Sequence, residues 1–152
     1  MTESERERLN RNVIELLQEL RVAQAGVQIL FGFLLAVAFT DVYHRASTFQ
    51  RGTHLVTMLF ATAAVACFTM PVAWHRLLFR LGQRERVIEV ANRMAVVGIG
   101  CLAAAMTGTV LLVTSVVLGG WLPVLITVLV GAGFAFAWFV LPLRVRLRAE
   151  AD

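Results

Sequence analysis

The stretch that decides the fold is MAVVGIGCLAAAMTGTVLLVTSVVL, residues 94–118, which contains no Asp, Glu, Lys, Arg or His. About 20 helical residues cross a hydrocarbon core of about 30 Å, so this stretch is long enough to span a bilayer. The same residue types are absent from residues 22–40, 55–74 and 121–143. The sequence therefore predicts an all-α integral membrane protein with four transmembrane helices.

The composition of the whole chain supports this class. Of 152 residues, 59% are hydrophobic and 16% are charged, and the mean hydropathy is +0.75. Soluble domains are about 45–50% apolar with glycine included and about 25% charged. These values exclude an ordinary water-soluble fold, a disordered chain and a nucleic-acid-binding domain. A transmembrane barrel is excluded because its segments of about ten residues would alternate between apolar and polar.

Arginine distribution predicts the orientation of the spans. All 14 basic residues are arginine. Only two, Arg45 and Arg51, fall in the connection between the first and second spans. The other twelve lie before the first span, between the second and third spans, or after the fourth. Because cytoplasmic loops are enriched in Lys and Arg, we expect both termini to be cytoplasmic, with only residues 41–54 and the Gly119-Gly120 turn outside.

The segments that flank the spans differ in character. Residues 1–21 have apolar positions at helical spacing and predict an amphipathic helix. This helix either lies along the inner leaflet or continues straight into the cytoplasm as a packing surface. Residues 144–152 form a basic cytoplasmic tail. No basic start followed by an early apolar stretch is present, so the first span is expected to remain as an uncleaved anchor.

A polar stripe marks the first span. Gln24 and Gln28 are one helical turn apart and share a face with Arg21 and Gly32. An amide that faces lipid would lack hydrogen-bond partners, so this face is expected to point into the protein. It serves either as a hydrogen-bonding contact between helices or as a polar vestibule at the mouth of a pathway.

Small residues recur every four positions in the third span, at Gly100, Ala104 and Gly108, and in the fourth span, at Gly131 and Ala135. Such rows let neighbouring backbones approach closely. The pattern predicts helix packing, within the chain or between copies of it. A crevice for a ligand is the alternative.

Three arginines, Arg76, Arg80 and Arg84, are spaced to share one face of a short helix whose other side carries leucines. A helix of this kind can lie in the interface, with its guanidinium groups on lipid phosphates. We therefore expect these residues to contact lipid headgroups. These three residues are also among the twelve arginines that predict the orientation of the spans.

Few residues outside the spans could carry ion chemistry. Asp41 and His44 are one helical turn apart at the end of the first span, and Glu89 precedes the third. These three are candidates for an ion or proton site. Solvated loop groups at Asp41 and His44, and a surface salt bridge between Glu89 and Arg93, are the alternatives. His54 is placed in the outer loop. The spacing of Cys, His and carboxylates predicts no metal site, no cofactor and no enzyme.

The stretches ELRVAQAGVQILFGFLLAVAF at residues 19–39 and PVAWHRLLFR at residues 71–80, with Trp138 and Pro142, resemble a family of small actinobacterial membrane proteins. Members have four spans and no known function, and many carry the label sodium:proton antiporter. The resemblance implies a four-helix inner-membrane protein. It implies no residue roles.

Two functions are favoured over a third, an enzyme acting on lipid, for which the sequence offers no convincing pair of nucleophile and base at one interface. The first is a structural, interaction or lipid-organising protein of the bacterial inner (plasma) membrane, whose partners are the lipid bilayer and either further copies of itself or another membrane protein. The alternative is an oligomeric proton-coupled cation transporter or channel component. A transporter of this kind needs an ionisable group near the bilayer midplane, and none of the four predicted spans contains one. Nucleic acid is not an expected partner.

Overall fold

The computed structural model of the chain describes residues 3–78 and 84–149, and within them every element is helical. The elements are α1 (Glu3–Ala38), α2 (Asp41–His44), α3 (Thr48–Leu78), α4 (Arg84–Val117), α5 (Leu122–Ala135), the π-helix η1 (Phe136–Val140) and α6 (Leu141–Ala149). Four stretches are long and apolar enough to cross a membrane: Gln18–Ala38, Thr48–Trp74, Glu89–Val117 and Leu122–Arg144. The prediction of an all-α chain with four such helices is confirmed.

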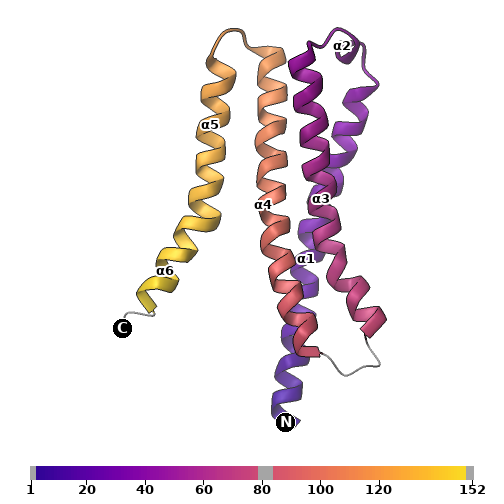
Figure 1. Ribbon diagram of the computed structural model, residues 1–152, viewed down its shortest axis with the longest axis vertical. Coiled ribbons are helices and arrows are strands. Elements are labelled where there is room, and N and C mark those ends of the chain that lie inside the picture. The colour runs from indigo at the N-terminus through magenta and orange to yellow at the C-terminus, as the bar shows by residue number, and fades with distance from the viewer. Residues whose placement is uncertain (1–2, 79–83, 150–152) are drawn as a thin grey trace.

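Three of the long helices, α1, α3 and α4, form a bundle (Figure 1). Helix α5 lies beside α4, on the side away from α3, and packs chiefly on α4. One end of the molecule holds the beginnings of α1 and α4 and the ends of α3 and α6. Helix α2 and the α4–α5 turn lie at the other end. This arrangement matches the predicted hairpin connectivity.

Buried positions in the bundle follow a seven-residue repeat. In α3 they alternate in steps of three and four: His54, Thr57, Ala61, Ala64, Phe68 and Pro71. In α1 they are Leu20, Val27 and Leu34, and in α4 they include Ala91, Gly98, Ala105 and Leu112. This repeat is typical of left-handed packing at small crossing angles. Because many of these side chains are small, the α3 and α4 backbones can approach closely.

The first connection is shorter than predicted, because α3 begins at Thr48 and not near Leu55. The Ser47 backbone N–H donates to Gln50 Oε1 at 2.9 Å, and the Gln50 N–H donates to Ser47 Oγ at 3.2 Å. This reciprocal pair is a capping box, which satisfies the free N–H groups at a helix start. The sequence Ser-Thr-Phe-Gln carries this signal. The prediction that residues 41–54 form a loop was therefore wrong, and His54 lies inside a helix.

Helix α1 is one continuous helix from Glu3 to Ala38. The predicted amphipathic segment and the first span are therefore parts of a single rod, and Figure 1 shows no right-angle bend between them. A helix lying along the membrane surface would need such a bend. The structure therefore has the straight geometry of the alternative in which the segment continues beyond the first span.

The fourth span changes its helical geometry near its end. After α5 the chain forms η1, in which the Leu141 N–H bonds to the Phe136 carbonyl, five residues earlier. Pro142 follows directly. Proline has no N–H to donate, and its ring would collide with the carbonyl four residues before it, so a wider turn there relieves the conflict.

The α4–α5 connection is a tight turn, as predicted. Gly120 has a φ of 73°, in the left-handed region that glycine enters without steric cost. Pro123 lies in the first turn of α5, where its missing N–H would have no helical partner in any case.

Candidate functional site

His54 is an ionisable side chain buried between α1 and α3. It is 3% exposed, and its ring Nε2 lies 2.8 Å from the backbone carbonyl oxygen of Leu34. A carbonyl can only accept, so Nε2 carries a hydrogen and donates it. This bond joins the last turns of α1 to the second turn of α3. His54 lies within the span Thr48–Trp74, so the prediction that places it in a loop outside the spans is wrong.

The end of the molecule that carries α2 closes around this histidine. The Tyr43 ring on α2 meets the His54 ring edge to face, with centroids 5.0 Å apart, a favourable aromatic geometry. The Thr40 side chain accepts from the Tyr43 N–H at 3.4 Å and so caps α2. Arg51 donates to the His44 carbonyl at 3.0 Å. Helix α2 thus covers the end of the α1–α3 contact.

The residues predicted as an ion or proton site are not brought together. Asp41 and His44 are exposed on α2. Glu89 lies near the beginning of α4, at the opposite end of the molecule (Figure 1). There it accepts from Arg93 at 2.6 Å in an exposed ion pair. Among the described residues, the buried ionisable side chain is instead His54. The sequence-based prediction placed this residue in a loop and not in a span.

The predicted polar face of α1 lies at the edge of the bundle contact and not inside it. Gln24 is half-buried, whereas Gln28 and Arg21 are exposed. The core-facing row of α1 is Leu20, Val27 and Leu34. Within one chain, the prediction that the whole polar face points into the protein is wrong, because apolar side chains at seven-residue spacing take that position.

The small-residue rows are divided between two neighbours. A Cβ added at Gly108 would collide with the Thr57 side chain of α3, whereas one added at Gly131 would lie 3.3 Å from Thr107 Cγ2 of α4. A Cβ at Gly100 would lie 3.7 Å from Phe139 Cζ. Ala135 is exposed. Gly108 therefore faces α3, whereas Gly100 faces the fourth span, so members of one row meet different neighbours.

A second close approach between α3 and α4 involves a glycine outside the predicted rows. A Cβ at Gly98 would lie 2.5 Å from Phe68 Cε1, and Phe68 is fully buried. Gly98 belongs to the seven-residue row of α4 that faces α3. The four-residue repeat predicted a contact at Gly100, which is two residues away and on another side of the helix.

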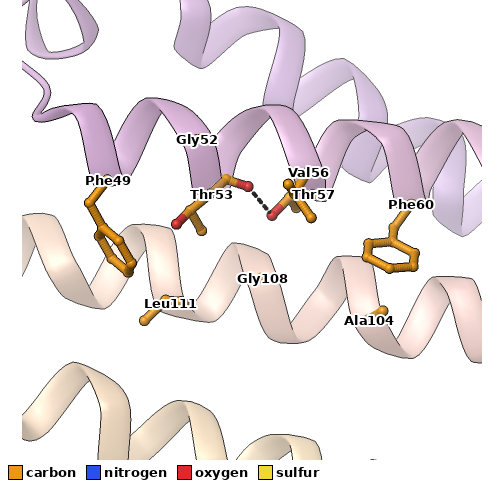
Figure 2. A pocket seen from close by; sticks show the side chains of 9 residues that line it. All are labelled: Phe49, Gly52, Thr53, Val56, Thr57, Phe60, Ala104, Gly108 and Leu111. Atoms are coloured by element: carbon orange, nitrogen blue, oxygen red, sulfur yellow. Dashed lines mark hydrogen bonds between the residues drawn. The ribbon is translucent and has the colours of Figure 1, made fainter.

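An apolar groove runs between α3 and α4 (Figure 2). Its volume is about 410 Å³. Phe49 and Phe60 lie toward its two ends, with Thr53 and Thr57 between them. The Thr57 hydroxyl donates to the Thr53 carbonyl at 2.7 Å, so this polar atom is satisfied by its own helix. Ala104 lines the groove from the α4 side.

Ala104 and Gly108 belong to the same row of small residues, but the groove predicts that they respond differently to a larger side chain. Ala104→Leu should change the free energy of unfolding by less than about 0.5 kcal/mol, because the added atoms enter open space. Gly108→Leu should cost about 2 kcal/mol, because the side chain has to displace Thr57. Unfolding of both variants in detergent micelles, by titration with a denaturing detergent, tests this. Equal losses would show that the groove closes in the folded protein.

Two of the three predicted headgroup arginines lie on different helices. Arg76 belongs to α3, which continues through Pro71 to Leu78, and Arg84 begins α4. Arg80 lies outside the described residues. The prediction of a separate short helix is therefore wrong, since the span helix continues into this region.

No group of three or more His, Cys, Asp or Glu side chains that could hold a metal ion occurs in the described residues. Both cysteines are unpaired and half-buried. Hydroxyls within the spans mostly donate to a carbonyl one turn earlier, as Thr107 does to Ala103 at 2.8 Å and Thr127 to Pro123 at 2.7 Å. In the described part of the chain, these groups satisfy themselves locally.

The chain is all-helical in its described part, with four helices long and apolar enough to cross a membrane. Three of them form a bundle and the fourth lies on one side. The chain belongs to a family described as a family of unknown function, DUF6328, whose model matches residues 2–142. No curated protein and no solved structure matches the chain.

Proposed function

We propose that this protein is a non-enzymatic structural or interaction component of the bacterial inner membrane, which binds lipid or other membrane proteins and does not move a solute. The observation that carries the proposal is the position of the fourth span. The most apolar part of Leu122–Arg144 has no buried residue, and α5 packs chiefly on α4. Most of its surface is therefore available for contacts within the membrane.

The arginine distribution supports a role at the cytoplasmic face. We propose that both termini and the α3–α4 connection are cytoplasmic, because twelve of the 14 arginines belong to these segments. Arg76, Arg80 and Arg84 would then lie near the anionic inner leaflet, where each basic residue contributes about 1 kcal/mol of attraction.

Cysteine labelling in intact cells tests this orientation. In a background of Cys67→Ala and Cys101→Ala, Ser47→Cys should react with a membrane-impermeant reagent, and Ala151→Cys should react only after lysis. Labelling efficiency is read on gels. The reverse pattern would show that the termini are outside.

A transporter is the second candidate, and His54 is the observation that favours it, because ionisable groups within membrane spans often mark ion or proton pathways. Two features oppose this role. His54 is near the outer end of its span and not at the midplane, and its ring is held by the Leu34 carbonyl.

Reconstitution into liposomes separates the two candidates. Wild-type vesicles should show no sodium-dependent proton movement above empty vesicles, measured with an internal pH dye. The same protein should retain anionic phospholipid through purification, and Arg76→Gln/Arg80→Gln/Arg84→Gln should lose it. Robust exchange that disappears in His54→Gln, but persists in Asp41→Asn/His44→Gln/Glu89→Gln, would establish transport through His54 and refute the proposal.

A further inference from the structure

Helix α1 carries a second row of positions at seven-residue spacing, on a side that the bundle leaves uncovered. Its members are Arg11, Ile14, Gln18, Arg21, Ala25, Gln28, Gly32 and Leu35, and all are exposed. They alternate in steps of three and four, as the contact positions of a two-stranded coiled coil do. Helix α1 therefore has two such faces, one of which packs on α3.

Gln28 is the member of this row that requires a partner. It is the central residue of the span Gln18–Ala38, about 15 Å from either end at 1.5 Å per residue. A glutamine side chain cannot reach an interface from that depth, and lipid tails offer neither donor nor acceptor. No hydrogen bond joins Gln28 to another side chain or carbonyl in the part of the chain that the structure describes.

We propose that two copies of this chain form a parallel dimer through the Ile14–Gln28–Leu35 face of α1. Both copies insert in the same orientation, so a twofold axis along the membrane normal places each Gln28 opposite the other. An amide is self-complementary, because its NH₂ group can donate to the partner's carbonyl oxygen while its own oxygen accepts. A single polar residue in such a contact also fixes register and the number of helices.

The neighbours of Gln28 fit this arrangement. Ala25 and Gly32 flank it on the same face, and a Cβ added at Gly32 would meet nothing within 4 Å. Small residues here let the second helix approach until the amides meet. Outside the span, Ile14 is 64% exposed and continues the row, so the dimer would also cover an apolar side chain that water otherwise surrounds.

Arg21 lies on the same face near the cytoplasmic end of the span. Its long side chain can turn toward phosphate groups and water there, so two copies of it need not meet. The proposal requires only that α1 crosses the bilayer. The dimer gives the proposed structural function a partner, which is a second copy of the chain. The liposome flux measurement does not bear on whether this dimer forms.

Disulfide cross-linking in native membranes tests the face, in the background of Cys67→Ala and Cys101→Ala. Ala25→Cys should form a covalent dimer on oxidation with copper phenanthroline. Gly26→Cys is the matched control, since this adjacent exposed position points about 100° away around the helix. A dimer from Gly26→Cys that equals the one from Ala25→Cys, no dimer from Ala25→Cys, or a product with a different protein would each refute the proposed face or its occupant.

Dimer affinity tests the role of the amide. Energy transfer between labelled chains in liposomes should show that Gln28→Leu weakens the dimer by about fivefold to thirtyfold, the range expected for hydrogen bonds between membrane helices. Gln28→Asn keeps an amide and should retain more of the affinity. A Gln28→Leu dimer as tight as the wild type would show that the amides do not pair.

Discussion

Replacement of Gly98 by leucine should lower the free energy of unfolding by about 3 kcal/mol, the upper part of the range for overpacked cores. A Cβ at this position would lie 2.5 Å from Phe68 Cε1 and 2.8 Å from Cδ1, well inside the contact distance of about 3.5–4.0 Å between carbon atoms. Phe68 is completely buried, so its ring has no open space to enter. The α3 and α4 helices would have to separate.

Gly26→Leu provides the control, because a Cβ at Gly26 would meet nothing within 4 Å. Its effect should be within about 0.5 kcal/mol. Unfolding in micelles by titration with a denaturing detergent gives both values. The double variant Gly98→Leu/Phe68→Ala should be more stable than the sum of the two single losses predicts, since the collision is removed. Strict additivity would show that the two residues do not meet.

His54→Ala should cost about 3 kcal/mol, because it combines a large-to-small substitution in a packed site with the loss of a hydrogen bond. His54 is almost fully buried, and its Nε2–H is the donor to the Leu34 carbonyl that joins α3 to α1. The truncation would also remove the ring against which Tyr43 packs. We expect α2 to become more accessible to proteases in this variant.

His54→Gln distinguishes the hydrogen bond from the volume. Glutamine can place a side-chain N–H near the position of Nε2, so this variant should lose only about 1 kcal/mol. The same detergent titration measures both substitutions. If the alanine and glutamine variants were both as stable as the wild type, the α1–α3 contact at this end would not depend on His54.

The elements that could be predicted from sequence are those with local causes. Spans follow from runs of apolar residues, because every backbone polar group in a bilayer has to be satisfied within a helix. The Gly119-Gly120 turn follows from backbone freedom at glycine. The start of α3 was also within reach, since Ser47 and Gln50 form a capping box. The charge-free run begins only after His54, so the hydropathy pattern places the start of this helix near Leu55 and not at Thr48.

The sequence by itself determined the membrane class, the four spans and the arginine asymmetry, because these depend on the identity of each residue and its immediate neighbours. The tertiary structure decided which side of each helix meets which neighbour. Gly98 and Gly100 are equally small in the sequence, but only Gly98 faces Phe68. The polarity of Gln28 predicts a position inside the protein, but the Leu20, Val27 and Leu34 row occupies the α3-facing side. A helix offers several faces of similar composition, and the packing of all its neighbours at once selects among them.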